Sequence, residues 1–91
     1  MSFEIRWTAR FKKDYKTAMR RGQPMEELDE VIRLLAEGEE LPEKYRDHAL
    51  VGNWLGHREC HIRPNWLLIY AVNNRTLVLT LARTGTHSDL L

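Results

Sequence analysis

The segment WLLIYAVNNRTLVLTLART, residues 66–84, decides the fold of this chain. Its first part, residues 66–72, is apolar or aromatic at every position, which is typical of a central strand buried on both faces. Asn73 and Asn74 then predict a tight hairpin turn, because asparagine tolerates positive φ. In residues 76–84 leucine recurs at every second position, which predicts a second strand antiparallel to the first.

A third strand is predicted on the N-terminal side of this hairpin. It covers residues 56–64, and a turn at Pro64 and Asn65 leads from it into the central strand. Because successive side chains of a strand point to opposite faces, four polar residues share one face of it: His57, Glu59, His61 and Arg63. The other face carries Arg58, Cys60 and Ile62. A shorter strand is expected near residues 48–52.

The N-terminal part predicts one strand and two helices. Residues 3–7 (FEIRW) alternate as a half-buried strand does, and Thr8 can cap the helix that follows. Apolar residues recur at helical spacing in this helix and in a second helix from about Pro24 to Glu37. The two stripes are Phe11, Tyr15, Ala18 and Met19, and Leu28, Val31, Ile32 and Leu35. Gly38 is expected to end the second helix.

The resulting order of elements is β-α-α-β-β-β-β, in a single domain that spans residues 1–91. Strands joined by short turns are antiparallel, and both helices come before the last four strands. We therefore predict an α+β fold with two N-terminal helices packed on one face of a small, mostly antiparallel sheet. The opposite face is expected to be open or to form a cleft.

The charged residues are sorted along the chain, although the net charge is only +1. Residues 6–21 carry seven cations against one acid, and residues 26–43 carry eight acids against one arginine. The C-terminal half is basic again. This segregation suits a polyanion partner, and two solvated helix faces of complementary charge would explain it equally well.

Several classes of protein and of site are disfavoured by composition. Apolar runs near 18 residues and the apolar core of a secretory signal are missing, and the single Cys60 fits a reducing compartment, so we expect a cytoplasmic protein with no membrane contact. On a strand His57 and His61 would lie roughly 13 Å apart and could not share an ion. The motifs of zinc and serine enzymes are also missing, so we expect no metal and no cofactor.

Acid–base chemistry on RNA remains as an option. RNA supplies its own nucleophile, the 2′-hydroxyl, so a protein needs a base, an acid and cations around the phosphate. The histidines His48, His61 and His87 lie near predicted strand ends that could converge. Arg83 suits a phosphate, and the ring of Trp66 could stack on an unpaired base. For any single histidine, a solvated surface group is the commoner case.

Three blocks of the chain together resemble the YafQ-type toxins of the RelE/ParE superfamily. They are YRDHALVGNW (residues 45–54), RECHIRPNWLLIY (58–70) and RTGTHSDLL (83–91), and the similarity covers nearly the whole chain. The resemblance implies a RelE-like fold and the toxin of a type II toxin–antitoxin system. Such toxins are bacterial, ribosome-dependent endoribonucleases that enter the A site of the 30S subunit and cut mRNA without a metal. Their other partner is a cognate antitoxin.

The resemblance also implies roles for particular residues. His87 would be the general acid. His48 and His61 would assist as base, proton relay or phosphate ligand. Arg83 would stabilise the pentacoordinate phosphate, and Trp66 would position the message or shape the site.

Two departures from the family pattern leave alternatives open. The family often has an acid in the turn where this chain has Asn65, and an aromatic residue is common where it has Leu91; both positions are expected to bind substrate. Asn65 cannot take up a proton at neutral pH, which could weaken the enzyme. The alternatives are a ParE-like protein that acts on a protein target such as DNA gyrase, or a degenerate toxin that only binds its antitoxin.

Overall fold

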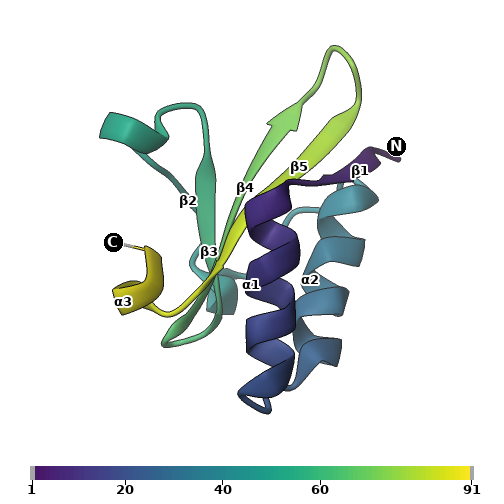
Figure 1. Ribbon diagram of the computed structural model, residues 1–91. Coiled ribbons are helices and arrows are strands. Elements are labelled where there is room, and N and C mark those ends of the chain that lie inside the picture. Colours follow the sequence, from purple (N-terminus) through teal and green to yellow (C-terminus); the bar gives the residue numbers. More distant parts are fainter. Residues whose placement is uncertain (1, 91) are drawn as a thin grey trace.

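The structure is a computed structural model that describes residues 2–90 (Figure 1). Its elements in chain order are β1 (Glu4–Trp7), α1 (Ala9–Arg20), α2 (Met25–Ala36), η1 (Glu43–Tyr45), β2 (His48–Ala49), η2 (Gly52–Trp54), β3 (Arg58–Arg63), β4 (Trp66–Asn73), β5 (Val78–Gly85) and α3 (His87–Leu90). The predicted α+β order is confirmed, with the two short 3-10 turns η1 and η2 and the short helix α3 in addition.

The five strands form one sheet in the order β1-β5-β4-β3-β2. β1 pairs with β5 in parallel, and the other neighbours are antiparallel. β4 lies in the middle, and its first five residues are buried, as the apolar run predicts. Figure 1 shows α1 and α2 side by side on one face of this sheet.

The larger core lies between the two helices and the sheet. Thr8 caps α1, since its Oγ1 accepts a hydrogen bond from the Phe11 amide at 3.1 Å. The predicted stripe of α2 is buried, and Gly38 follows that helix with φ of 76°, a conformation that glycine adopts readily. One residue of the α1 stripe was predicted wrongly. Met19 is half exposed, because it lies near the end of α1 at the rim of the core.

The β4–β5 hairpin is longer than the predicted two-residue turn. Asn73 pairs with Val78, so residues 74–77 form the loop. The Asn73 side chain accepts hydrogen bonds from the amides of Arg75 and Thr76, and Leu77 has φ of 56°. The prediction that β5 begins at residue 76 was therefore wrong, because the Asn73 side chain stabilises a wider turn.

A β-bulge in β5 changes the alternation of its side chains. Tyr70 pairs with Leu81 and Ile69 with Arg83, which leaves Ala82 as an extra residue between them. Leu81 belongs to the helix-side core, and Ala82 to a second, smaller cluster on the opposite face. That face is partly covered, because Leu90 of α3 joins this cluster, and Leu50, which follows β2, and Trp54 of η2 pack against it.

Candidate active site

Three histidine rings form a row on the sheet face opposite the helices. His48 comes from β2, His61 from β3 and His87 from the start of α3. The ring centroids of His48 and His61 are 6.3 Å apart, and those of His61 and His87 are 5.8 Å apart. We call these three residues the histidine row. Its members are thus brought together as the sequence suggested, with His61 between the other two.

Glu59 lies beside this row and was missed as a site residue. It pairs with His48 in the β2–β3 ladder, and its side chain is only 7% exposed. Its Oε1 is 3.4 Å from Nε2 of His48 and 3.9 Å from Nε2 of His61. A buried carboxylate in this place can orient both rings and stabilise positive charge on them. The signal in the sequence was its spacing of two residues from His61, which puts both side chains on one strand face.

The outer rings of the row are each oriented through Nδ1. In His48, Nδ1 lies 2.9 Å from the carbonyl oxygen of Arg46, which can only accept, so Nδ1 carries the hydrogen. In His87, Nδ1 lies 3.0 Å from Oδ1 of Asn65, and the same oxygen accepts the His87 amide at 3.3 Å. Asn65 therefore fixes the His87 ring and leaves its Nε2 as the nitrogen that can take up or release a proton.

The fourth histidine, His57, does not belong to the row. It precedes β3 and packs edge-on against Trp54, with ring centroids 5.1 Å apart. Its Nδ1 is buried and has no hydrogen-bond partner among the described residues. The histidines of the predicted polar strand face therefore have different surroundings: His57 packs against Trp54 of η2, and His61 belongs to the histidine row.

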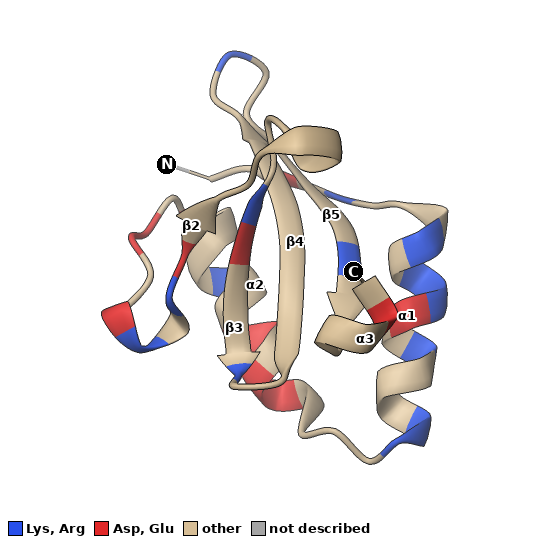
Figure 2. Ribbon diagram, turned by 90° about the vertical axis from the view of Figure 1, so that its left-hand side faces the viewer, with Lys and Arg blue, Asp and Glu red and all other residues tan. Residues whose placement is uncertain are grey.

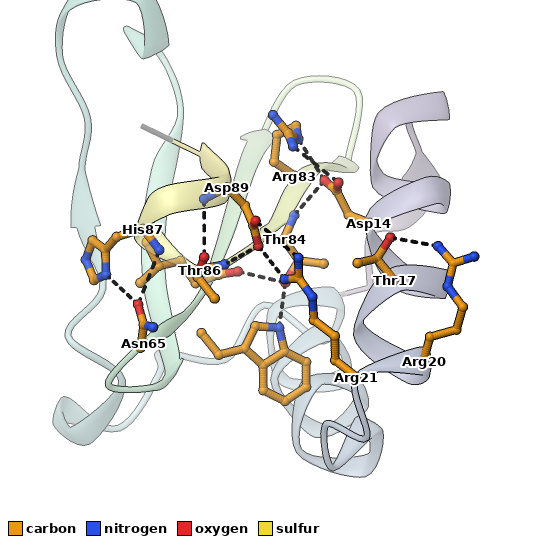
Figure 3. A network of polar contacts seen from close by, with 12 residues as sticks. Asp14, Thr17, Arg20, Arg21, Asn65, Arg83, Thr84, Thr86, His87 and Asp89 are labelled. Carbon is orange, nitrogen blue, oxygen red and sulfur yellow. Dashed lines mark hydrogen bonds and ion pairs between the residues drawn. The ribbon is translucent and has the colours of Figure 1, made fainter.

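Arg83 is already bound to a carboxylate. Its Nε donates to Oδ2 of Asp14 at 2.7 Å and its Nη2 to Oδ1 at 3.2 Å. The Thr84 amide also donates to Asp14, and the carboxylate raises the pKa of Arg83. Both side chains are about 15% exposed. Figure 3 shows Arg83 turned toward Asp14 of α1, so its Nε and Nη2 donors are engaged there and are not presented to the histidine row.

Trp66 is in the core and not on the surface. It is 1% exposed and belongs to the helix-side cluster, and its Nε1 donates to Oγ1 of Thr84 at 3.0 Å. Stacking of Trp66 on an unpaired base does not fit this burial, because the first residue of β4 points into the helix-side core, and its role in positioning the message or shaping the site stays a prediction. Trp66 can shape the site only indirectly, through its hydrogen bond to Thr84 of β5. Leu91, the last predicted site residue, lies outside the described residues.

Among residues 2–90 there is no group of three or more His, Cys, Asp or Glu side chains arranged to hold a metal ion. None of the helices in the same range is long and apolar enough to cross a membrane. Burial raises the pKa of the Cys60 thiol, which disfavours the reactive thiolate.

Nearly the whole chain matches one protein family. Residues 3–91 match a protein family described as the bacterial toxin of type II toxin–antitoxin system, YafQ. The mRNA interferase toxin YafQ of Escherichia coli strain K12 is 38% identical over 88 residues, which cover 96% of this chain and 94% of that protein.

Solved structures resemble this one closely. The crystal structure of YafQ from Escherichia coli BL21(DE3) superposes with a TM-score of 0.92 at 36% identity over 98% of both chains. The crystal structure of the Escherichia coli DinJ–YafQ toxin–antitoxin complex gives a TM-score of 0.91 at 36% identity, over 100% of this chain and 99% of that one.

Proposed function

The chain belongs to the YafQ family of bacterial type II toxins, and we propose that it is the toxin of such a system and an mRNA interferase. It would bind the A site of the 30S subunit and cut the mRNA there. The observation that carries this proposal is the histidine row, with Asn65 on Nδ1 of His87 and Glu59 beside the other two rings. A protein that acted only by binding would have no need of three adjacent imidazoles.

The proposed reaction begins with proton transfer from the 2′-hydroxyl of the message. His48 takes this proton, with Glu59, whose Oε1 lies 3.4 Å from Nε2 of His48, stabilising the imidazolium that forms. The 2′-oxygen then attacks the adjacent phosphorus, and the bond from phosphorus to the 5′-oxygen breaks. His87 gives its Nε2 proton to that leaving oxygen. The products are a 2′,3′-cyclic phosphate and a 5′-hydroxyl end. The chain needs no metal or small-molecule cofactor for these steps.

In this proposal, His61 is the main group that stabilises the negative charge on the pentacoordinate phosphate. His61 lies between the base and the acid, next to both rings. Arg83 can reach the phosphate only by sharing or leaving the carboxylate of Asp14. We therefore assign Arg83 a second place, as a cation that the bound message could draw away from Asp14.

The partners follow from the family and from the distribution of charge. By analogy with the DinJ–YafQ complex of Escherichia coli, a cognate antitoxin would bind and neutralise this chain. α1 lies next to α3 (Figure 2), and its exposed lysines Lys12, Lys13 and Lys16 can contact ribosomal RNA phosphates or an acidic segment of the antitoxin. The ribosome and the mRNA would place the protein in the bacterial cytoplasm.

Primer extension on a reporter mRNA tests the function directly. The message is translated in a reconstituted system with and without the purified protein. Cuts inside codons that depend on ribosomes support the nuclease and reveal its codon preference. Intact mRNA in the presence of a folded protein would overturn the proposal, and would favour a ParE-like or degenerate protein that acts by binding.

Asn65→Asp is expected to increase cleavage or to extend it to higher pH. A carboxylate at this position can accept the same two hydrogen bonds from His87, and its charge favours the protonated ring that the general acid requires. We expect the alkaline limb of the pH–rate profile to move to higher pH. Single-turnover cleavage rates between pH 5 and 9 measure this shift.

The matched control for this variant is Asn74→Asp. Asn74 is exposed in the loop between β4 and β5, so the substitution adds the same charge away from the histidine row. Its profile should match that of the wild type. A clear loss of cleavage in folded Asn65→Asp would contradict the orienting role of Asn65.

A further inference from the structure

The short helix α3 carries His87 but cannot hold its own position. It has four residues, His87–Leu90, and helices of this length are not stable alone in water. The place of His87 relative to the rest of the histidine row therefore depends on the contacts that α3 makes with the body of the domain.

Asp89 and Thr86 close the start of α3 by a reciprocal pair of hydrogen bonds. The Thr86 amide donates to Oδ2 of Asp89 at 2.9 Å, and the Asp89 amide donates to Oγ1 of Thr86 at 3.2 Å. This is the arrangement of a capping box. It requires a glycine next to it, because a Cβ atom at Gly85 would lie 2.9 Å from Cβ and Oδ2 of Asp89.

The same carboxylate is bound from the other side by α1. Nη1 of Arg21 donates to Oδ2 of Asp89 at 2.6 Å, and its Nη2 lies 3.4 Å from Oδ1 (Figure 3). The two residues are 68 positions apart in the sequence. This contact, which we call the Arg21–Asp89 latch, ties α3 to the end of α1.

The latch persists throughout the pH range in which cleavage would be measured. The hydrogen bond from Arg21, followed by that from the Thr86 amide, lowers the pKa of Asp89 to about 2. A lowered folded pKa means that the contact is fully present above the usual pKa of an aspartate and is lost only as the pH falls toward 2. A change of rate between pH 5 and 9 therefore belongs to other groups.

We propose that Arg21 and Asp89 are positioning residues for His87. Three contacts fix α3: Asn65 holds the His87 ring, Leu90 is buried in the smaller cluster, and the latch holds the outer side. Leu90 and Asn65 leave α3 free to tilt about the line between them, and the latch removes this freedom. The inference rests on the proposed nuclease activity, because it concerns the general acid of that reaction.

Arg21→Ala tests the latch, with Arg20→Ala as the matched control. Arg20 is the preceding, exposed arginine, and among the described residues its side chain hydrogen-bonds only to Thr17. Both variants lose one positive charge from the end of α1, but only the first releases Asp89. We expect Arg21→Ala to slow single-turnover cleavage about fivefold at an unchanged thermal midpoint, and Arg20→Ala to remain near wild type. Arg21→Lys should recover part of the loss.

A double-mutant cycle with Asp89→Asn separates positioning from a general charge effect. An asparagine keeps an oxygen for the Thr86 amide but loses the ion pair. If the latch acts as a unit, the double variant with Arg21→Ala should be no slower than the slower single variant. Additive losses, or equal losses in Arg21→Ala and Arg20→Ala, would overturn the proposal.

A readout independent of cleavage keeps the two proposals apart. Amide hydrogen exchange at Asp89 and Leu90 should be faster in Arg21→Ala than in wild type or Arg20→Ala, and the ring signals of His87 should shift. If the wild-type protein does not cut mRNA, the nuclease fails while these signals still test the latch. Unchanged exchange and unchanged His87 signals in Arg21→Ala would overturn the latch even if the nuclease is active.

Discussion

His87→Ala is expected to lower ribosome-dependent mRNA cleavage by about a hundredfold or more while the domain stays folded. The substitution removes the only ring nitrogen that Asn65 orients, and with it the proton for the leaving 5′-oxygen. The side chain is exposed at the start of α3, so its loss costs little packing. The measurement is the single-turnover cleavage rate on programmed ribosomes, with the thermal midpoint followed by circular dichroism.

Ser88→Ala provides the control for this variant. Ser88 is the next residue of α3 and is exposed, so the substitution tests whether any change in this helix disturbs the site. Its cleavage rate should stay near that of the wild type. A folded His87→Ala protein that cuts at the wild-type rate would refute the role of His87 as general acid.

Trp66→Ala is expected to lower the free energy of unfolding by about 3–5 kcal/mol, which is a large part of the stability of a domain of this size. Trp66 is among the largest fully buried side chains. Its removal leaves a cavity between β4 and the helices and takes the Nε1 donor from Thr84. Urea unfolding, followed by circular dichroism, measures the change. Trp7→Ala should cost less, because Trp7 on β1 is 39% exposed.

Trp66→Phe separates a structural role from a role in binding the message. This variant keeps an aromatic ring in the core but loses the hydrogen bond to Thr84 and part of the buried ring volume, so we expect a loss of about 1–3 kcal/mol in unfolding free energy and nearly normal cleavage. A strong loss of cleavage at nearly unchanged stability would show instead that the indole contacts RNA.

The sequence could predict those parts of the fold that depend on regular spacing. The apolar run in residues 66–72 identifies the central strand, and the stripe Leu28, Val31, Ile32 and Leu35 identifies the buried face of α2. His48 and His61 could also be placed near each other, because antiparallel pairing across the connection of residues 50–57 puts His48 opposite Glu59, two residues from His61.

Other parts of the site depend on contacts that spacing does not encode. The sequence suggests that Arg83 is free to bind a phosphate. In the fold, α1 places Asp14, 69 positions away in the sequence, in contact with it. The bulge at Ala82 reverses the alternation in β5, so faces counted from Leu77 are wrong beyond it. Trp66 looks like a surface aromatic beside a turn, and only the packing of the helices shows that it lies in the core.

The parallel pairing of β1 with β5 has a consequence for the kinetics of folding. Glu4 lies opposite Val78, so this ladder closes a loop of most of the domain, and such long-range contacts form slowly compared with helices and hairpins. The same closure brings α1, with Asp14 and Arg21, onto β5 and α3. A chain with both helices and the β4–β5 hairpin formed but β1 undocked would show helical circular dichroism and yet be inactive. Cleavage activity is therefore expected to return during refolding together with the docking of β1 and not before it.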